Sequence, residues 1–208
     1  MEYLNIDTWN RKQHFEHFKQ LLDPYFAVTV EVDVTRAYQT AKGKKIPFFV
    51  LYLHACMKAI NAVENFKYRI TEDEKIRIYN VIHASATIMR PDNTFGFSFI
   101  YYSDSLDVFY ENFKKEKVRI LSSTELFPKF NSDNCVYCSA LPWVNFTGHK
   151  EPKNSDSDSI TRLAFGKFIE KDNTLKMPVS ITVNHALIDG YHVGLFLENY
   201  QKALDTIQ

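Results

Sequence analysis

The residues of this chain best suited to chemistry are a histidine and an aspartate four positions apart, His185 and Asp189, followed by Gly190. Histidine ionises near neutral pH, so a histidine held near solvent can carry a proton during a reaction. The alternative is structural: His185 ends a strand, Asp189 caps the following helix, and Gly190 relieves the turn. The spacing leaves both interpretations open.

The flanking sequence predicts a strand followed by a helix. Val179, Ile181 and Val183 alternate with polar residues, which is typical of a half-buried strand. Beyond Asp189 a helical period begins, with four apolar residues on one face: Val193, Leu197, Tyr200 and Leu204. His185 and Asp189 are therefore expected in a strand-to-helix turn, where the sheet fixes the backbone and the imidazole stays near solvent.

Another charged residue of interest lies near the start of the chain. Asp7 and Thr8 can cap a helix over residues 11–22, which places Arg11 in the first turn. A cation gains nothing from the helix dipole at that end, so an acidic partner elsewhere explains Arg11 better than local propensity does. The more common alternative is a solvated surface arginine.

The three cysteines, Cys56, Cys135 and Cys138, are an odd number, which fits reduced thiols better than a disulfide framework. The spacing of Cys135 and Cys138 also occurs in zinc and redox sites. No second pair accompanies them, however, and strand alternation would point the two sulfurs to opposite faces. We therefore expect strand cysteines and no metal site.

The sequence of the whole chain predicts about eight strands and four or five helices. Besides the elements above, helices are expected over 35–42, 48–63 and 105–121, and strands over 26–34, 66–70, 75–79, 82–89, 95–102, 135–140 and 160–169. A basic loop covers 43–45 and a polar loop covers 151–159. Because strands and helices do not alternate regularly, the fold class is α+β: a two-layer sandwich with helices mainly on one face of a mixed, mostly antiparallel sheet.

Length and charge limit the class of function. The 208 residues suit a single domain over 1–208 that buries its core without cross-links. Lys plus Arg and Asp plus Glu both total 25, so no charge bias favours binding to nucleic acid. The N-terminus has no secretory pattern and no apolar run reaches a membrane-spanning length, so we expect a cytoplasmic protein without membrane contact.

Motifs spread along the chain resemble those of the chloramphenicol acetyltransferase family of CoA-dependent acyltransferases. The segment 185–190 matches the His-x-x-x-Asp-Gly signature, which dihydrolipoyl and carnitine acyltransferases and condensation domains share. Further matches are Trp9-Asn-Arg11, His14-Phe15-Glu16, Ser139-Ala-Leu-Pro-Trp-Val-Asn-Phe146 and Met177-Pro178. The resemblance covers the chain from end to end and implies the family's fold.

The resemblance also implies roles for four residues. His185 would be the general base that deprotonates the acceptor hydroxyl directly, in a ternary complex without an acyl-enzyme. Asp189 would form an ion pair with Arg11 that holds the histidine loop, and Ser139 would donate a hydrogen bond to the oxyanion. Read from its local sequence, Ser139 is a strand-end serine bonded to nearby backbone.

The implied co-substrate is acetyl-CoA, with no permanently bound cofactor. The sequence has no glycine-rich phosphate loop, so side chains would hold the CoA phosphates. By resemblance, Trp143 packs in the CoA channel, and Lys167 and Lys44 match positions near the nucleotide end. The family is a homotrimer with active sites at the subunit interfaces, where His185 and Ser139 come from different subunits.

The acceptor pocket implied by the resemblance contains Phe18, Leu22, Phe95 and Phe97, and departs from the family pattern. Compared with the family pattern, Phe18 stands in place of a tyrosine, and Phe97 stands close to the position at which the family has a small residue. Ala164 stands in place of a threonine, and Asn184 in place of the first of two histidines. The implied reaction is O-acetylation of chloramphenicol. The alternatives are the same chemistry on another small hydroxyl compound and a non-catalytic ligand-binding module.

Overall fold

A computed structural model describes residues 2–130, 132–152 and 158–207 of the chain. Its α-helices are α1 Lys12–Phe18, α2 Thr35–Lys44, α3 Phe48–Ala62, α4 Leu106–Leu121 and α5 Gly190–Thr206, and short 3-10 helices span Ile6–Thr8 and Glu64–Lys67. Its strands are β1 Glu2–Tyr3, β2 Tyr25–Asp33, β3 Tyr68–Ile70, β4 Ile76–Ile78, β5 His83–Met89, β6 Phe95–Phe97, β7 Cys135–Leu141, β8 Arg162–Gly166, β9 Ile169–Lys171 and β10 Thr174–Asn184. Within the predicted polar loop 151–159, residues 153–157 lie outside the described part.

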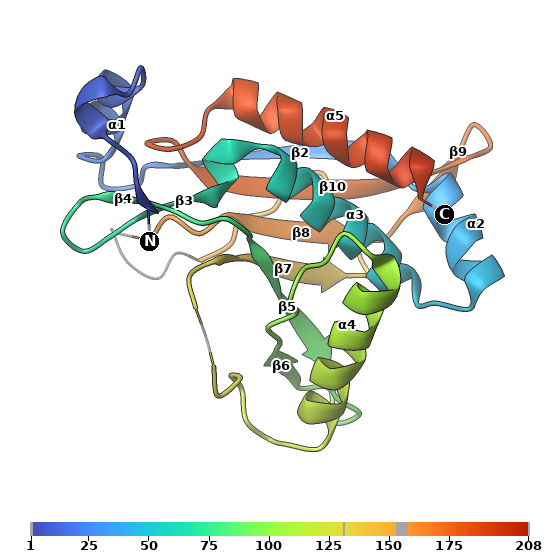
Figure 1. Cartoon of the computed structure of the whole chain (residues 1–208). Coiled ribbons are helices and arrows are strands. Elements are labelled where there is room, and N and C mark those ends of the chain that lie inside the picture. Colours follow the sequence, from blue (N-terminus) through green and yellow to red (C-terminus); the bar gives the residue numbers. More distant parts are fainter. Residues whose placement is uncertain (1, 131, 153–157, 208) are drawn as a thin grey trace.

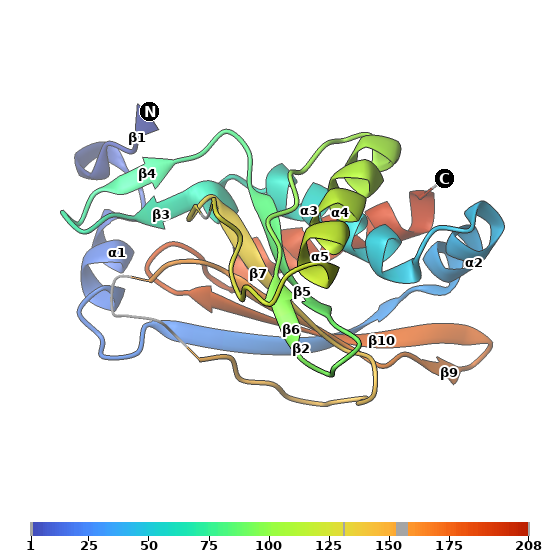
Figure 2. The ribbon, with the colours of Figure 1, turned by 90° about the horizontal axis from the view of Figure 1, so that it is seen from below.

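The main sheet has the strand order β2-β10-β8-β7-β5-β6, with β9 paired to β10. Strands β5, β7 and β8 run parallel and the other neighbours pair antiparallel. Helices α3, α4 and α5 lie on one side of this sheet, while α1 lies beside a small second sheet of order β1-β4-β3 (Figures 1 and 2). The α+β class, the mixed sheet and the one-sided helices are therefore confirmed.

Strand β10 leads directly to the histidine and is buried on both faces over residues 177–184, so the prediction of a half-buried strand is wrong. Val179, Ile181 and Val183 are fully buried in the core beneath the helices. The alternate residues on the opposite face, which include Ser180 and Asn184, are also buried. Segments outside the sheet cover this face: the side chain of Asn184 donates to the carbonyl of Asp158, and Phe146 and Pro178 both lie against Gly166.

The predicted helix over residues 11–22 is wrong at both ends. Asn5, rather than Asp7 or Thr8, caps the first turn, and that turn is a separate 3-10 helix. Helix α1 begins at Lys12 with Arg11 at its N-cap position and ends at Phe18. The proline at position 24 disfavours helical backbone only at Asp23, so it does not by itself explain why the helix ends five residues earlier.

Two further details bear on function. Helix α2 continues to Lys44, so the predicted basic loop at 43–45 is mostly helical, and Lys45 follows it with a left-handed backbone. In the described part of the chain, no helix is long and apolar enough to cross a membrane.

Candidate active site

His185 lies directly after β10, in the turn before α5, as the sequence predicts. Its backbone N–H donates to the carbonyl of Pro24 over 2.7 Å. The ring stacks on Phe18, with centroids 3.9 Å apart and planes 6° from parallel, and a second contact to Phe26 spans 4.7 Å. Nδ1 is buried and has no hydrogen-bond partner among the described residues, so a substrate can reach this ring only through Nε2.

Arg11 and Asp189 form the ion pair that the resemblance implies, although 178 positions separate them. Arg11 is 8% exposed, and its Nη2 also donates to the backbone carbonyl of His185 over 3.4 Å. The guanidinium therefore connects the Asp189 carboxylate to the histidine turn. Among the described residues, the rings of Phe18 and Phe26 orient the His185 ring, and the Asp189 carboxylate is instead bound to Arg11.

Asp189 also has the structural role of an N-cap, because its side chain accepts from the N–H of Tyr191 over 3.0 Å at the start of α5. Burial acts to raise the pKa of Asp189, but the charges of Arg11 and His192 outweigh it and hold this pKa below its ordinary value of 3.8. The carboxylate is thus ionised at neutral pH and available to Arg11.

His192 is a residue of this network that the sequence analysis missed. Its Nδ1 lies 2.8 Å from Oδ1 of Asp189 and 3.2 Å from the backbone nitrogen of Asp189. Burial lowers the pKa of His192, against the opposing effect of the Asp189 carboxylate. The signal was available, since a polar residue three positions after an N-cap aspartate occupies the capping-box position.

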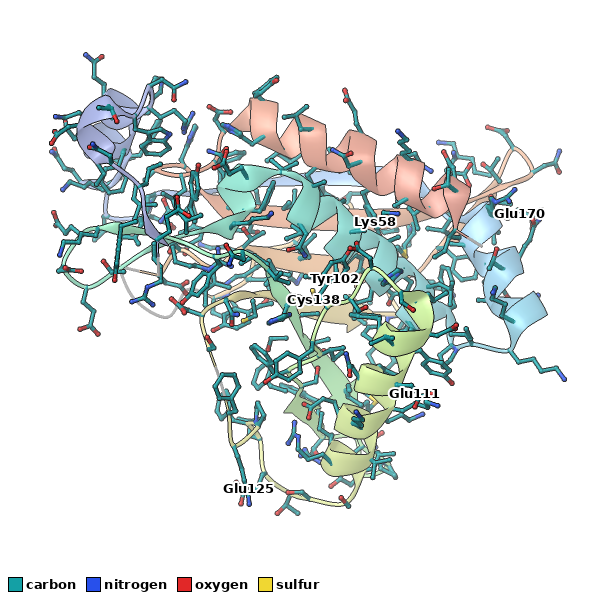
Figure 3. All side chains as sticks on the ribbon, viewed as in Figure 1. Lys58, Tyr102, Glu111, Glu125, Cys138 and Glu170 are labelled. Carbon is teal, nitrogen blue, oxygen red and sulfur yellow. The ribbon has the colours of Figure 1, made fainter. Side chains whose placement is uncertain are left out.

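Ser139 lies on β7 and borders two cavities. A cleft of about 680 Å³ passes Ser139 and is lined by residues that include Phe95, Phe113 and Trp143. A smaller cavity of about 180 Å³ adjoins the same serine and is bordered by Phe97. Figure 3 labels the neighbouring residue Cys138 near the middle of the molecule.

Within one chain, His185 and Ser139 do not meet. Ser139 pairs with Ala164 on β8, and Ala164 pairs with Ser180 on β10, so these three residues share one row across the sheet. From Ser180 to the end of β10 the chain advances four residues, about 13 Å, and the row spans two strand spacings of about 5 Å each. A reacting atom must lie about 3 Å from both the base and the oxyanion donor, which this separation prevents.

The residues predicted for the acceptor pocket also fall into two groups, one near His185 and one near Ser139. Phe18 contacts the His185 ring, and Leu22 is exposed four positions further along the chain. Phe95 and Phe97 instead border the cavities beside Ser139. A single chain therefore presents two separate halves of the predicted pocket.

The residues expected near CoA lie along the surface beyond Ser139. Trp143 is 65% exposed on the wall of the large cleft, and the N–H of Lys167 donates to the carbonyl of Val144 over 2.8 Å. Lys44 is exposed in the last turn of α2. A ring contact of 5.1 Å between Tyr38 of α2 and Phe168 brings the α2 segment close to the segment that carries Lys167.

The cysteines contribute no metal site in the described residues, where no group of three His, Cys, Asp or Glu side chains could hold an ion. Cys56, Cys135 and Cys138 are buried free thiols. Burial raises the pKa of Cys135 to about 12, so this thiol is neutral and unreactive at physiological pH.

Replacing Asp189 with asparagine is expected to lower stability by about 2 kcal/mol, because Arg11 loses its counter-ion while buried. Asparagine caps helices as well as aspartate does, so the N-cap is retained. The pair stabilises the fold above the unfolded-state pKa of Asp189, and this contribution is lost as the pH falls through the lower folded-state pKa.

Thermal unfolding of Asp189→Asn at pH 7 measures this loss. The matched control is Glu111→Gln, which removes an exposed ion pair with Lys114 on α4 and should change little. Equal melting temperatures for Asp189→Asn and the unaltered protein would show that the pair with Arg11 contributes nothing.

Comparisons with known proteins identify the family of this chain. The family model described as chloramphenicol acetyltransferase matches residues 1–201. The chain is 28% identical to a chloramphenicol acetyltransferase of Staphylococcus aureus, over 97% of each chain, and 28% identical to one of Escherichia coli, over 99% of this chain and 94% of that protein.

A solved structure described as chloramphenicol acetyltransferase superposes with a TM-score of 0.88 at 26% identity, over 98% of this chain and 99% of the other. The match in sequence thus extends to the whole arrangement of strands and helices that places His185 at the end of β10. By sequence and by fold, this acyltransferase belongs to the chloramphenicol acetyltransferase family.

Proposed function

We propose that the protein transfers an acetyl group from acetyl-CoA directly to a hydroxyl group of a small acceptor, within a ternary complex. The observation that carries this proposal is the His185 ring, which is fixed between two aromatic rings with Nδ1 buried and Nε2 left for a substrate. The retention of Ser139, Asp189 and Arg11 with it argues against a non-catalytic binding module.

In the proposed reaction, Nε2 of His185 accepts the proton of the acceptor hydroxyl as the oxygen attacks the thioester carbonyl. The hydroxyl of Ser139 donates to the oxyanion that forms on the carbonyl oxygen. The intermediate then collapses, the carbon–sulfur bond breaks, and the departing CoA sulfur receives the proton from His185. Acetyl-CoA is a substrate in this scheme, and the protein forms no covalent bond to the acetyl group.

We propose that two copies of the chain complete each site, with His185 and Phe18 from one subunit and Ser139, Phe95 and Phe97 from its neighbour in a homotrimer. The support is the separation of the two halves within one chain. Exposed aromatic side chains near β6 supply an apolar surface that a neighbouring subunit would cover: Phe95, Tyr101, Phe127 and Phe130.

Acetyl-CoA would lie in the cleft of about 680 Å³, with its thioester beside Ser139. Trp143 would pack against the pantetheine arm, since an exposed indole on a cleft wall offers a large apolar contact. Lys167 and Lys44 would meet the phosphates as exposed cations. A cytoplasmic location, where acetyl-CoA is made and used, fits this substrate.

Chloramphenicol is the first acceptor to consider, because the relatives are named for it. A second acceptor class is favoured by the small cavity beside Ser139. Phe97 forms part of its wall, so the half of the proposed two-subunit pocket that this chain supplies is narrowed beside Ser139. The same chemistry on a more compact hydroxyl compound is therefore the second candidate.

The direct test is release of free CoA thiol from acetyl-CoA by purified protein, with and without chloramphenicol, alongside mass spectrometry of the acceptor. We expect acceptor-dependent thiol release and a product heavier by one acetyl group. Thiol release that stays at the acceptor-free rate with chloramphenicol and with a panel of small alcohols would overturn the proposal.

A further inference from the structure

The cavity of about 180 Å³ beside Ser139 contains more charge than an apolar acceptor requires. Glu151 and Arg162 line it together with Phe97, Phe127 and Tyr137. This cavity adjoins the serine that would hold the thioester carbonyl, so it is where the acceptor would lie. The residues that line it therefore indicate which chemical class of acceptor would bind there.

Arg162 has its charge compensated within the protein. It forms an ion pair with Asp158 in which both side chains are 4% exposed, and its Nη1 donates to the carbonyl of Ile160 over 2.9 Å. The guanidinium carbon also lies 5.3 Å from the ring centre of Tyr25 and 5.6 Å from that of Tyr137. An anionic acceptor would gain little from a cation already committed in this way.

Glu151 is in the opposite situation. Its side chain is 20% exposed, and its charged neighbour among the described residues is His149, whose Nε2 lies 3.8 Å away, beyond hydrogen-bond distance. The Glu151 carboxylate is thus partly exposed and has no hydrogen bond within the described residues, so a donor or cation in the cavity would gain a favourable partner. Among the described residues that line this cavity, Arg162 is paired with Asp158, and Glu151 is the charged residue without an ion pair to lysine or arginine. Glu151 also borders the two neighbouring clefts, which Lys150 lines with it.

Aromatic rings face the same space. Phe97 and Phe127 are stacked with centroids 5.1 Å apart and planes 15° from parallel, and Tyr137 forms part of another wall. Aromatic faces combined with a carboxylate are the surroundings that bind organic cations such as quaternary ammonium groups. We propose that the acceptor is a compact cationic alcohol, whose positive group pairs with Glu151 while its hydroxyl points toward the thioester.

This inference rests on the proposed acetyl transfer and narrows its acceptor. The experiment compares two probes of nearly the same shape, choline and 3,3-dimethyl-1-butanol, in which carbon replaces the charged nitrogen. Neither probe has an amine that could be acetylated, so thiol release from acetyl-CoA reports O-acetylation of each. Chloramphenicol serves as a third acceptor.

We expect kcat/KM to be at least tenfold higher for choline than for the neutral alcohol, and Glu151→Gln to abolish this preference by lowering the choline value alone. Glu111→Gln, which alters an exposed glutamate of α4 (Figure 3), should keep the preference. Equal kcat/KM for the two probes, or a preference for choline that persists in Glu151→Gln, would overturn the inference. Thiol release that depends on His185 with chloramphenicol or the neutral alcohol but not with choline would overturn it and leave the acetyl transfer standing. A complete lack of His185-dependent thiol release would overturn both.

Discussion

His185→Ala is expected to lower kcat by about 10³- to 10⁴-fold, because it removes the group that accepts the hydroxyl proton. No neighbouring side chain can replace it: the ring contacts of His185 are the hydrocarbon faces of Phe18 and Phe26, and the nearby Asp189 carboxylate is committed to Arg11. Steady-state kinetics measure the loss, and the KM for acetyl-CoA should change little, because that substrate binds mainly beside Ser139.

The matched control is His17→Ala, which removes an exposed imidazole that also packs on Phe18, with ring centres 5.0 Å apart. It should retain near-normal turnover. Melting temperatures should show both variants folded, since His185 is only partly buried and truncation empties little core. A His185→Ala variant with more than a tenth of normal kcat would exclude this residue as the base.

Ser139→Ala is expected to lower kcat by about 10²- to 10³-fold, the usual effect of removing one oxyanion donor. Binding of acetyl-CoA should be retained, because the hydroxyl contacts the carbonyl oxygen most strongly in the transition state. The kinetic signature is therefore a lower kcat with little change in KM.

Ser180→Ala is the matched control, because Ser180 lies in the same row of the sheet and its buried hydroxyl has no hydrogen-bond partner among the described residues. Removing an unpaired buried hydroxyl is close to neutral for stability. If Ser139→Ala lost no more activity than Ser180→Ala, an oxyanion role for Ser139 would be untenable.

Local patterns predicted the elements around the histidine. The alternation ending at His185 and the helical period after Asp189 correctly placed both residues in a strand-to-helix turn. Helix α3 and the first hairpin also followed the sequence closely, because their apolar periods and polar turns lie within a few residues of each other. The second hairpin forms where predicted, but its second strand, expected over 95–102, ends at Phe97.

Long-range packing could not be predicted in this way. The burial of Ser180 and Asn184 depends on segments distant in the chain, such as the one in which the Asp158 carbonyl accepts from Asn184, and no local pattern specifies those contacts. The separation of His185 from Ser139 depends on register across three strands. The partner of Arg11 was likewise inferred from family resemblance, since Asp189 lies 178 positions away.

The charged cavity beside Ser139 was not foreseen either. The sequence predicts a polar loop for the segment that contains Glu151 and an ordinary strand for the segment that contains Arg162, and both residues line this cavity. Only the fold brings them together, because β8 carries Arg162 next to Tyr137 of β7. The sequence therefore indicated the reaction better than it indicated the acceptor.

The most direct test of the central claim mixes the two inactive variants, His185→Ala and Ser139→Ala, after they are unfolded and refolded together. In randomly assembled trimers from an equal mixture, about a quarter of the interfaces join an intact His185 to an intact Ser139. We expect recovery of about a quarter of normal thiol release from acetyl-CoA, far above either variant refolded separately. A refolded mixture no more active than the separate variants would contradict a site in which His185 and Ser139 come from different subunits.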